Sequence, residues 1–354
     1  MTAARLAAAA LTAALTVSCG QGGPGPARSD AAATIAAAVN ATDAPGERRK
    51  AIRIAMIAKS ATNPIFLSAR TGAEAAARDL SAKIGTPIEI VWLTPAQEDG
   101  YVQVQRVVQA VNEGMTAILL SVTDADKITP TIDAAVARGV PVMTFDGDAP
   151  GSKRFAFFGV DDRRLGETVM KELAKQIGGR GKVAILAGNQ AAANLRKRVD
   201  GVKTAAARFP GIKIVGTFHH VETPQEAVAE VIRVNKAYPD LRGWAMVGGW
   251  ALFTKTLLTD AGAATKKIVA VDALPPELDY VIKGLAPVLL AQPAYLWGNV
   301  GVVKIVDKVH FHKDVADLPP MDFVKVTMDN LADWSRQLRR WGFADVPEEY
   351  LQLK

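Results

Sequence analysis

Cysteine is almost absent from this sequence, with one residue, Cys19, among 354. A single thiol cannot close an internal disulfide, and it cannot supply the paired thiolates of a zinc site. Histidine is scarce as well, and its two close pairs, His219 with His220 and His310 with His312, do not have the spacing of a zinc motif. We therefore expect no metal site and no redox role.

The motifs of several enzyme classes are also missing. No GxGxxG follows an expected strand, and neither GxxxxGK[ST] nor HExxH occurs. The sequence "GGRGK" (178–182) is only superficially similar to a phosphate-binding loop, because it comes after an expected helix. We expect no cofactor, and we expect a protein that is not an enzyme.

No block of basic residues is present. Lys plus Arg total 42 and Asp plus Glu total 36, so the formal net charge is +6, and the basic residues are scattered. This pattern does not indicate nucleic-acid binding. Hydrophobic residues at 49% and charged residues at 22% fit a globular protein, and the length suits two domains.

The N-terminal apolar stretch, residues 6–17, is too short for a membrane-spanning helix, which needs about 20 residues. It follows Arg5 and has the length of a signal-peptide core. The sequence "LTVSCG" at its end resembles a bacterial lipobox, although Thr16 stands where leucine is usual. We expect residues 1–19 to be a signal peptide with lipidation at Cys19; the alternative is an ordinary secretory signal with an incidental cysteine. Residues 20–50, rich in Gly, Ala, Pro and Asp, are expected to be a flexible tether.

From residue 50 onward, apolar runs alternate with amphipathic stretches. Runs this apolar on both faces are typical of parallel strands covered by helices, and the alternation predicts a doubly wound α/β fold. A first sheet is expected from strands at 52–58, 88–93, 117–122 and 141–146, and a second from strands at 155–161, 182–188, 212–220, 243–250 and 267–273. Helices are expected at 66–85, 100–114, 128–139, 164–179, 195–210, 224–238, 251–262 and 296–309. The segments 287–293 and 323–330 are expected to return across the junction of the two domains.

Polar side chains follow the expected strands where ligand sites form in such sheets. Carboxylates and amides can bridge neighbouring hydroxyls, arginine can donate a fork of hydrogen bonds, and aromatic rings can cover the apolar face of a sugar. No nucleophile and base stand together among them. This set of residues indicates a binding site for a polyol.

Three stretches resemble one family. They are "IAMIAKSATNPIFLSARTGAEAAARDL", "TFDGDAPGSKRFAFFGVDDRRLGE" and "LAGNQAAANLRKRVDGVKTA". In order and spacing they are similar to the periplasmic sugar-binding proteins of the ribose-binding type, which share a fold with the ligand-binding half of LacI-type repressors. The resemblance implies two lobes, residues 51–160 plus 293–322 and residues 161–292 plus 323–354, joined by a three-segment hinge. It also implies a sugar in the cleft.

The resemblance carries a set of ligand-binding positions onto this chain: Asn63, Phe66, Ser121, Asp146, Asp148, Asn194, Arg198, Trp250, Asp272 and Gln292, with Lys59, Ile65 and Trp92 as further candidates. Gly147 stands where ribose binders have arginine, which argues against ribose. Asp148 has an alternative role as a turn or capping residue, and Trp92 as a packing residue. We expect a closed form without ligand to be rare, because it would bury Asp146, Asp272 and Arg198 unpaired.

The resulting hypothesis is a monomeric, lipid-anchored solute-binding protein, periplasmic or on the cell surface, that delivers a sugar or polyol to the permease subunits of an ABC importer. The alternative is a periplasmic receptor for a sugar or a furanose autoinducer that signals to a chemoreceptor or a sensor kinase. A repressor is disfavoured, because the region before Lys50 has the pattern of a signal peptide followed by a tether and not that of a helix-turn-helix domain.

Overall fold

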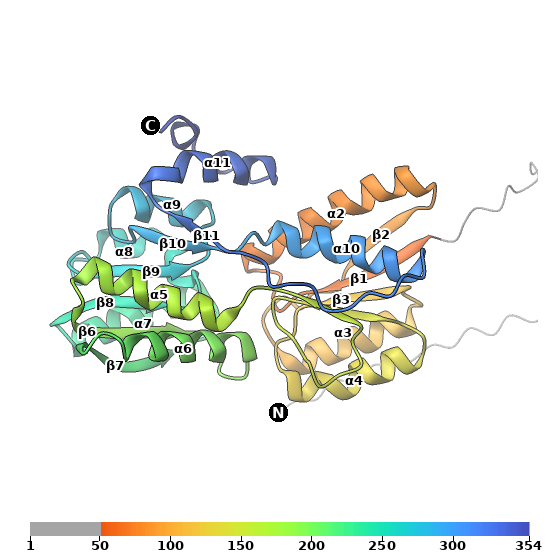
Figure 1. Ribbon diagram of the computed structural model, residues 1–354, viewed down its shortest axis with the longest axis horizontal. Helices are drawn as coiled ribbons and strands as arrows, with labels where there is room; N and C mark the ends of the chain where they lie inside the picture. The colour runs from red at the N-terminus through yellow and green to blue at the C-terminus, as the bar shows by residue number, and fades with distance from the viewer. Residues whose placement is uncertain (1–50, 354) are drawn as a thin grey trace, which may run out of the picture. The chain divides into compact units, whose positions relative to one another are not determined.

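The computed structural model describes residues 51–353. The expected signal peptide, Cys19 and the tether lie outside the described residues. Within the described range, no helix combines the length and apolar character needed to span a bilayer. The chain forms two sheets with helices packed on them (Figure 1).

The first sheet has five parallel strands in the order β2-β1-β3-β4-β5. They are β1 (Ile52–Ile57), β2 (Ile88–Trp92), β3 (Ala117–Leu120), β4 (Val142–Phe145) and β5 (Ala156–Phe158). The expectation that the segment 155–161 opens the second sheet is wrong, because β5 pairs with β4, with Phe145 opposite Phe158. The alternation of strands and helices cannot reveal this, since no helix separates β4 from β5.

Helices α3 (Gly100–Asn112) and α4 (Ala125–Ala137) share one apolar core with this sheet, while α2 (Pro64–Ile84) and α10 (Tyr295–Val309) belong to another. Helix α10 comes from far along the chain and lies beside α2 (Figure 1). The two backbones touch at glycines: a Cβ on Gly72 would lie 1.9 Å from the carbonyl oxygen of Tyr295, and one on Gly298 would lie 1.8 Å from that of Ala69. We call this sheet with its four helices lobe 1.

The second sheet has six strands in the order β11-β10-β9-β8-β6-β7, and only β11 is antiparallel. The strands are β6 (Arg180–Ala187), β7 (Gly211–His219), β8 (Leu241–Met246), β9 (Lys267–Val271), β10 (Val288–Ala291) and β11 (Val324–Val326). Its helices are α5 (Asp162–Ile177), α6 (Ala193–Ala206), α7 (Pro224–Ala237), α8 (Thr256–Thr259), α9 (Pro275–Ile282) and α11 (Leu331–Arg340), with 3₁₀ turns at η1 (Trp250–Leu252), η2 (Met328–Asn330) and η3 (Glu348–Gln352). We call this unit lobe 2.

The single helix expected over 251–262 is wrong, because only η1 and the four-residue α8 form there. The hydroxyl of Thr254 accepts from the backbone N–H of Thr256, and the carbonyl of Thr254 accepts from the hydroxyl of Tyr280. Side-chain hydrogen bonds of this kind compete with helical ones, so the helix is interrupted.

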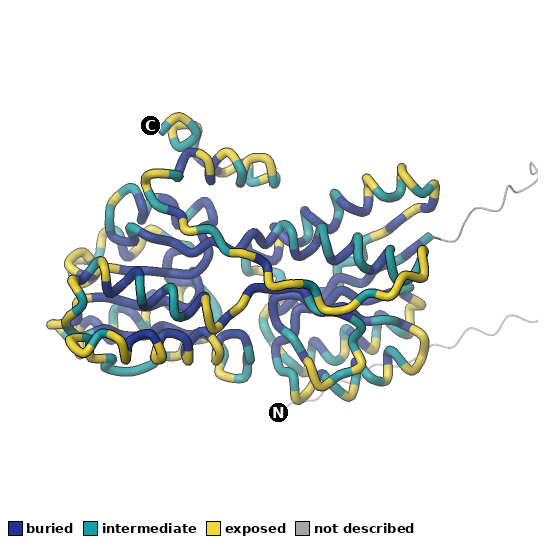
Figure 2. The backbone as a smooth tube through the Cα atoms, viewed as in Figure 1, coloured by how far each residue is buried: buried dark blue, intermediate teal, exposed yellow. Residues whose placement is uncertain are grey.

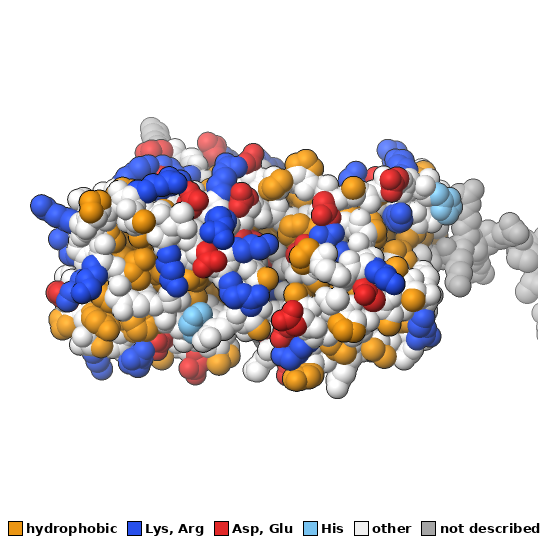
Figure 3. All heavy atoms as spheres, turned by 60° about the horizontal axis from the view of Figure 1, so that its bottom comes forward, with side chains coloured by type: hydrophobic (Ala, Val, Ile, Leu, Met, Phe, Trp, Pro, Cys, Tyr) orange, Lys and Arg blue, Asp and Glu red, His pale blue; other side chains and the backbone are white. Residues whose placement is uncertain are grey.

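The chain crosses between the lobes three times, from β5 to α5, from β10 to α10 and from α10 to β11. Two of these crossings pair with each other, since Val160 forms a parallel bridge with Met321, whose N–H donates to the carbonyl oxygen of Gly159 at 2.7 Å. Figure 2 shows that the inner strands of both sheets are buried, while the edge strands β2 and β7 are mostly half-buried and exposed residues gather on the outer helices and loops. On the face in Figure 3, basic and acidic side chains are interspersed.

Candidate functional site

A small cavity of about 30 Å³ lies among residues that follow the carboxyl ends of strands in both sheets. Its lining from lobe 1 is Lys59, Asn63, Ile65, Phe66, Asp146 and Trp297, and from lobe 2 it is Asn194, Leu195, Arg198, Glu222, Gly248, Trp250, Asp272 and Gln292. This volume holds about two water molecules. A sugar can therefore enter only if some of these side chains, or the lobes, move.

Asp146 ends β4 and is the acceptor at the centre of the site. One carboxylate oxygen accepts from Ser121 Oγ at 2.9 Å and lies 3.2 Å from Lys59 Nζ, and the other accepts from Asn194 Nδ2 at 3.1 Å. Its φ of 53° is in the left-handed region, which is rare for a residue with a side chain and typical of functional sites. The turn at Asp146 directs this carboxylate to both lobes.

Gly147, the residue after Asp146, occupies a position that has no room for a side chain. A Cβ there would lie 2.2 Å from the carbonyl oxygen of Val122 and 3.0 Å from Lys59 Cε. The stem of Lys59 thus occupies space next to residue 147, which explains why a large residue is excluded at this position.

Lys59 follows β1 and joins the two lobes. Its side chain is buried, and Nζ donates to Asn194 Oδ1 of lobe 2 at 3.1 Å while facing Asp146. Burial alone would lower the pKa of Lys59, but the carboxylates of Asp146, Glu98 and Glu222 outweigh it and raise that pKa above its ordinary value. The ammonium group therefore stays charged beside Asp146.

Arg198, on α6, makes three hydrogen bonds inside lobe 2. Nε donates to Asp162 Oδ1 at 2.8 Å, Nη1 to the carbonyl oxygen of Val247 at 3.1 Å, and Nη2 to Gln292 Oε1 at 2.9 Å. Nη2 also lies 3.7 Å from Asp146 Oδ1 across the cleft. The guanidinium plane is fixed by three partners and presents one edge to lobe 1.

Asp162, which the sequence analysis did not select, is the buried counter-ion of Arg198. Burial raises the pKa of Asp162 to about 6, and the charge of Arg198 opposes this rise. The only signal for it in the sequence is its place after Asp161, whose side chain caps α5.

Asp272 is the lobe 2 counterpart of Asp146. It ends β9 with a φ of 80°, accepts from Gln292 Nε2 at 2.9 Å, and accepts from the N–H of Gly249 at 3.3 Å. Burial raises the pKa of this carboxyl group, while Arg198 opposes the shift. Each lobe thus contributes one carboxylate on a left-handed residue at a strand end.

The expectation that closure without ligand would leave Asp146, Asp272 and Arg198 unpaired is wrong. All three have partners within the protein, namely Ser121, Lys59, Asn194, Gln292, Asp162 and backbone groups. A sequence alone does not show that Lys59 and Asn194 reach the same carboxylate from opposite lobes.

Aromatic rings form the apolar part of the wall. Phe66 stands edge-on to Phe145 at 6.4 Å between centroids, and Phe145 lies 6.0 Å from Trp297. Across the cavity, Trp250 stands edge-on to His220 at 5.1 Å. Trp297 also lines the cavity but was not predicted from the sequence, because it lies within α10 and does not follow a strand.

Three predicted residues do not line the cavity. Ser121 acts one step away, by donating to Asp146. Asp148 instead pairs with Arg154, with N–O distances of 2.5 and 2.8 Å, and accepts from Thr144. Trp92 packs under the guanidinium of Arg70 at 5.3 Å. Trp92 thus has the packing role that was its alternative, whereas Asp148 forms an ion pair with Arg154.

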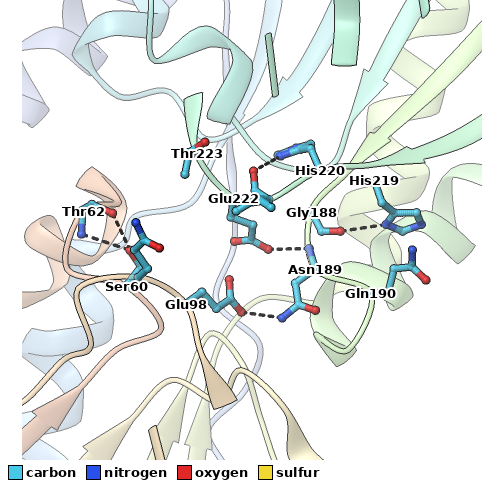
Figure 4. Close-up of a pocket in the computed structure, with 12 residues that line it drawn as sticks. Ser60, Thr62, Glu98, Gly188, Asn189, Gln190, His219, His220, Glu222 and Thr223 are labelled. Atoms are coloured by element: carbon cyan, nitrogen blue, oxygen red, sulfur yellow. Dashed lines mark hydrogen bonds between the residues drawn. The ribbon is translucent and has the colours of Figure 1, made fainter. Parts of the chain in front are cut away.

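A larger pocket of about 540 Å³, the cleft-mouth pocket, adjoins the cavity, since Glu222 lines both (Figure 4). Here Asn189 of lobe 2 donates from Nδ2 to Glu98 of lobe 1 at 3.1 Å and from its backbone N–H to Glu222 at 2.9 Å. The two carboxyl groups lie next to each other, and Asn189 donates to both from one side (Figure 4). Burial, and then the neighbouring Glu98, raise the pKa of Glu222 well above its usual range.

The site holds fixed donors and acceptors and no catalytic pair. In the described part of the chain, no group of three His, Cys, Asp or Glu residues could hold a metal ion. The arrangement suits recognition of a compound with several hydroxyl groups.

A family model described as the periplasmic binding protein domain matches residues 54–311. Among curated proteins, the ribose import binding protein RbsB of Bacillus subtilis is 30% identical over 158 residues, which is 45% of this chain and 50% of that protein. The xylitol-binding protein of Mycolicibacterium smegmatis is 26% identical over 199 residues, 56% of this chain and 57% of that protein. The chain thus spans about half the length of these curated relatives.

Solved structures share the fold. An ABC transporter solute-binding protein from Burkholderia graminis, in complex with D-arabinose, has a TM-score of 0.74 at 26% identity, over 81% of this chain and 98% of that one. The glucose-galactose binding protein GanP of Geobacillus stearothermophilus has a TM-score of 0.73 at 24% identity, over 80% and 99% of the two chains, and supports the fold alone. The expected two-lobed, doubly wound fold is confirmed.

Proposed function

We propose a function from one premise: this chain belongs to the periplasmic binding protein domain family. It binds a sugar or polyol in the cavity between the lobes and presents the ligand to an ABC importer. The relatives named above bind ribose, xylitol and D-arabinose, which supports a small polyhydroxy ligand. The function is binding and not catalysis.

One observation supports this most strongly: Asp146 and Asp272, one from each lobe, are presented on left-handed residues and are joined through Arg198 and Gln292. Two carboxylate acceptors, a guanidinium and an amide at fixed positions match hydroxyls that both donate and accept. Asn63, Phe66, Asn194 and Trp250 complete the proposed contact set, and Ser121 supports it through Asp146.

Ligand entry requires the lobes to separate. We take residues 51–160 with 293–322 as one moving lobe and 161–292 with 323–354 as the other, because the three crossings at their borders can absorb the rotation. Ligand then replaces Lys59 and Asn194 as the partner of Asp146 and shifts the population toward the closed form by its preference for that form.

The remaining parts of the proposal concern the cell. Lipidation at Cys19 would hold the protein, as a monomer, at the outer face of a membrane beside permease subunits. The motif at 15–20 and the Gly- and Pro-rich segment after it support this placement.

Titration calorimetry of the mature protein with D-ribose, D-arabinose, D-allose, xylitol and myo-inositol tests the proposal. At least one should bind with a Kd in the micromolar range or below and raise the melting temperature accordingly. If none binds at millimolar concentration, the sugar-binding function is refuted.

A further inference from the structure

The buried tryptophans fall into two groups according to whether they line the cavity. Trp244 and Trp334 lie outside it, and their indole N–H groups are paired, with Asn235 Oδ1 at 3.0 Å and with the carbonyl oxygen of Ala273 at 2.8 Å. Trp250 and Trp297 line the cavity, and the Nε1 of each is buried without a hydrogen-bond partner. A buried donor left unpaired costs free energy, so such atoms in a native fold require an explanation.

The other polar groups of the cavity wall do not supply an acceptor for these two indole N–H groups. The buried Lys59, Asn194, Arg198 and Gln292 all donate to acceptors within the protein, and Asp146 and Asp272 already accept from them. Among the buried side-chain nitrogens and oxygens of the residues that line the cavity, the two indole nitrogens are the ones without a partner. They are donors only, so what they lack is an acceptor.

The two donors come from opposite lobes. Trp297 is on α10 of lobe 1, with its ring against Phe145, while Trp250 opens η1 of lobe 2. An acceptor held by both would tie the lobes together.

Resting on the proposed function, we propose that Trp297 and Trp250 are specificity-determining residues whose indole N–H groups donate to oxygen atoms of the bound sugar or polyol. The ligand's hydroxyls then donate to Asp146 and Asp272 and accept from the two tryptophans. A compound without a hydroxyl or ring oxygen at these positions leaves the donors unpaired and is rejected.

The test is Trp297→Phe, which keeps an aromatic ring and removes the N–H. Trp244→Phe is the matched control, because Trp244 is equally buried, loses the same volume and has a partner outside the cavity. The probe is whichever of D-ribose, D-arabinose and xylitol binds the wild-type protein most tightly. Trp297→Phe should weaken binding by about threefold to tenfold, and Trp250→Phe should act in the same direction.

Stability of the ligand-free protein gives the second readout. Trp244→Phe leaves Asn235 Oδ1 without its donor and should lower the melting temperature by about 2–4 °C more than Trp297→Phe does. An unchanged Kd for Trp297→Phe with a probe that wild type binds would overturn the inference, as would a melting temperature as low as that of Trp244→Phe. If wild type binds none of the probes, the proposed function fails and this inference falls with it.

Discussion

Lys59 Nζ lies 3.2 Å from Asp146 Oδ2 and at the same time donates to Asn194 of the other lobe. One ammonium group therefore links the lobes of the ligand-free protein. In Lys59→Met this charge-assisted contact is lost, so the open form should gain population by about tenfold or more. Small-angle X-ray scattering without ligand should then give a larger radius of gyration than wild type.

The control for this variant is Lys255→Met. Lys255 is exposed and forms its ion pair with Asp279 within lobe 2. Its removal should leave the scattering unchanged. A Lys59→Met profile that superimposes on that of wild type would contradict the linking role of Lys59.

Asp146 and Asp148 allow a matched comparison of two neighbouring carboxylates. Asp146→Asn should weaken sugar binding by roughly 30- to 1000-fold, about 2–4 kcal/mol, because a charged acceptor inside the cavity is lost. Asp148→Asn breaks the pair with Arg154 outside the cavity, so affinity should be unchanged while stability falls. Calorimetry that finds equal effects on affinity would refute the assignment of Asp146.

Arg198 should be needed for stability as well as for binding. Its removal leaves Asp162 as a buried charge without its ion-pair partner, which costs about 3–5 kcal/mol. Urea denaturation of Arg198→Met should show this loss, and the added change Asp162→Asn should recover part of it. Strictly additive effects of the two substitutions would show that the ion pair is not the cause.

Affinity should rise as the pH falls. In the closed form the pKa of Glu222 is raised by burial and then by Glu98; when the lobes part, Glu222 leaves Glu98 and its pKa returns toward about 4.3. The closed form therefore binds the proton more tightly than the open form. Protonation of Glu222 stabilises the closed form at low pH, and this stabilisation is lost as the pH rises through the raised pKa of Glu222.

Calorimetry between about pH 5 and 8 measures this dependence. Glu222→Gln should flatten it, whereas Glu226→Gln, at an exposed position on α7, should not. His219 and His220 also line the pocket, so a slope that persists unchanged in Glu222→Gln would assign the effect to a group other than Glu222.

Lipidation can be measured directly. Mass spectrometry of the native mature protein should find Cys19 as the modified N-terminal residue, and Cys19→Ser should release soluble protein or leave uncleaved precursor. A mature, unmodified N-terminus beyond Cys19 would support the alternative of an ordinary secretory signal.

Asp146 and Asp272 were predictable because both follow apolar parallel strands, and strand ends converge in such sheets. Arg198 was predicted as a ligand-binding residue because the motif that contains it resembles the family. Trp297 was not predictable, because it lies on a helix that returns to lobe 1 from a distant part of the chain. Asp148 was misleading, since a sequence does not show that Arg154, six residues on, takes its carboxylate.

The fold was predicted best where periodicity was strong. The sequence did not show that β5 completes the first sheet, and it missed α9 and α11 altogether. Contacts between segments that are distant in sequence set other features: the bond from Tyr280 to Thr254 accompanies the interruption of one expected helix, and the backbone pairing of Val160 with Met321 holds two crossings together.

The glycine contact between α2 and α10 has a consequence for the order of assembly. Gly166 and Gly201 make the same kind of backbone contact between α5 and α6, which are neighbours in sequence, whereas Gly72 and Gly298 are separated by most of the chain. Closing so long a loop is slow. During synthesis lobe 2 can acquire its helix pair early, while lobe 1 has to wait for residues 295–309. A nascent chain therefore exposes the unfinished core of lobe 1 until α10 has emerged.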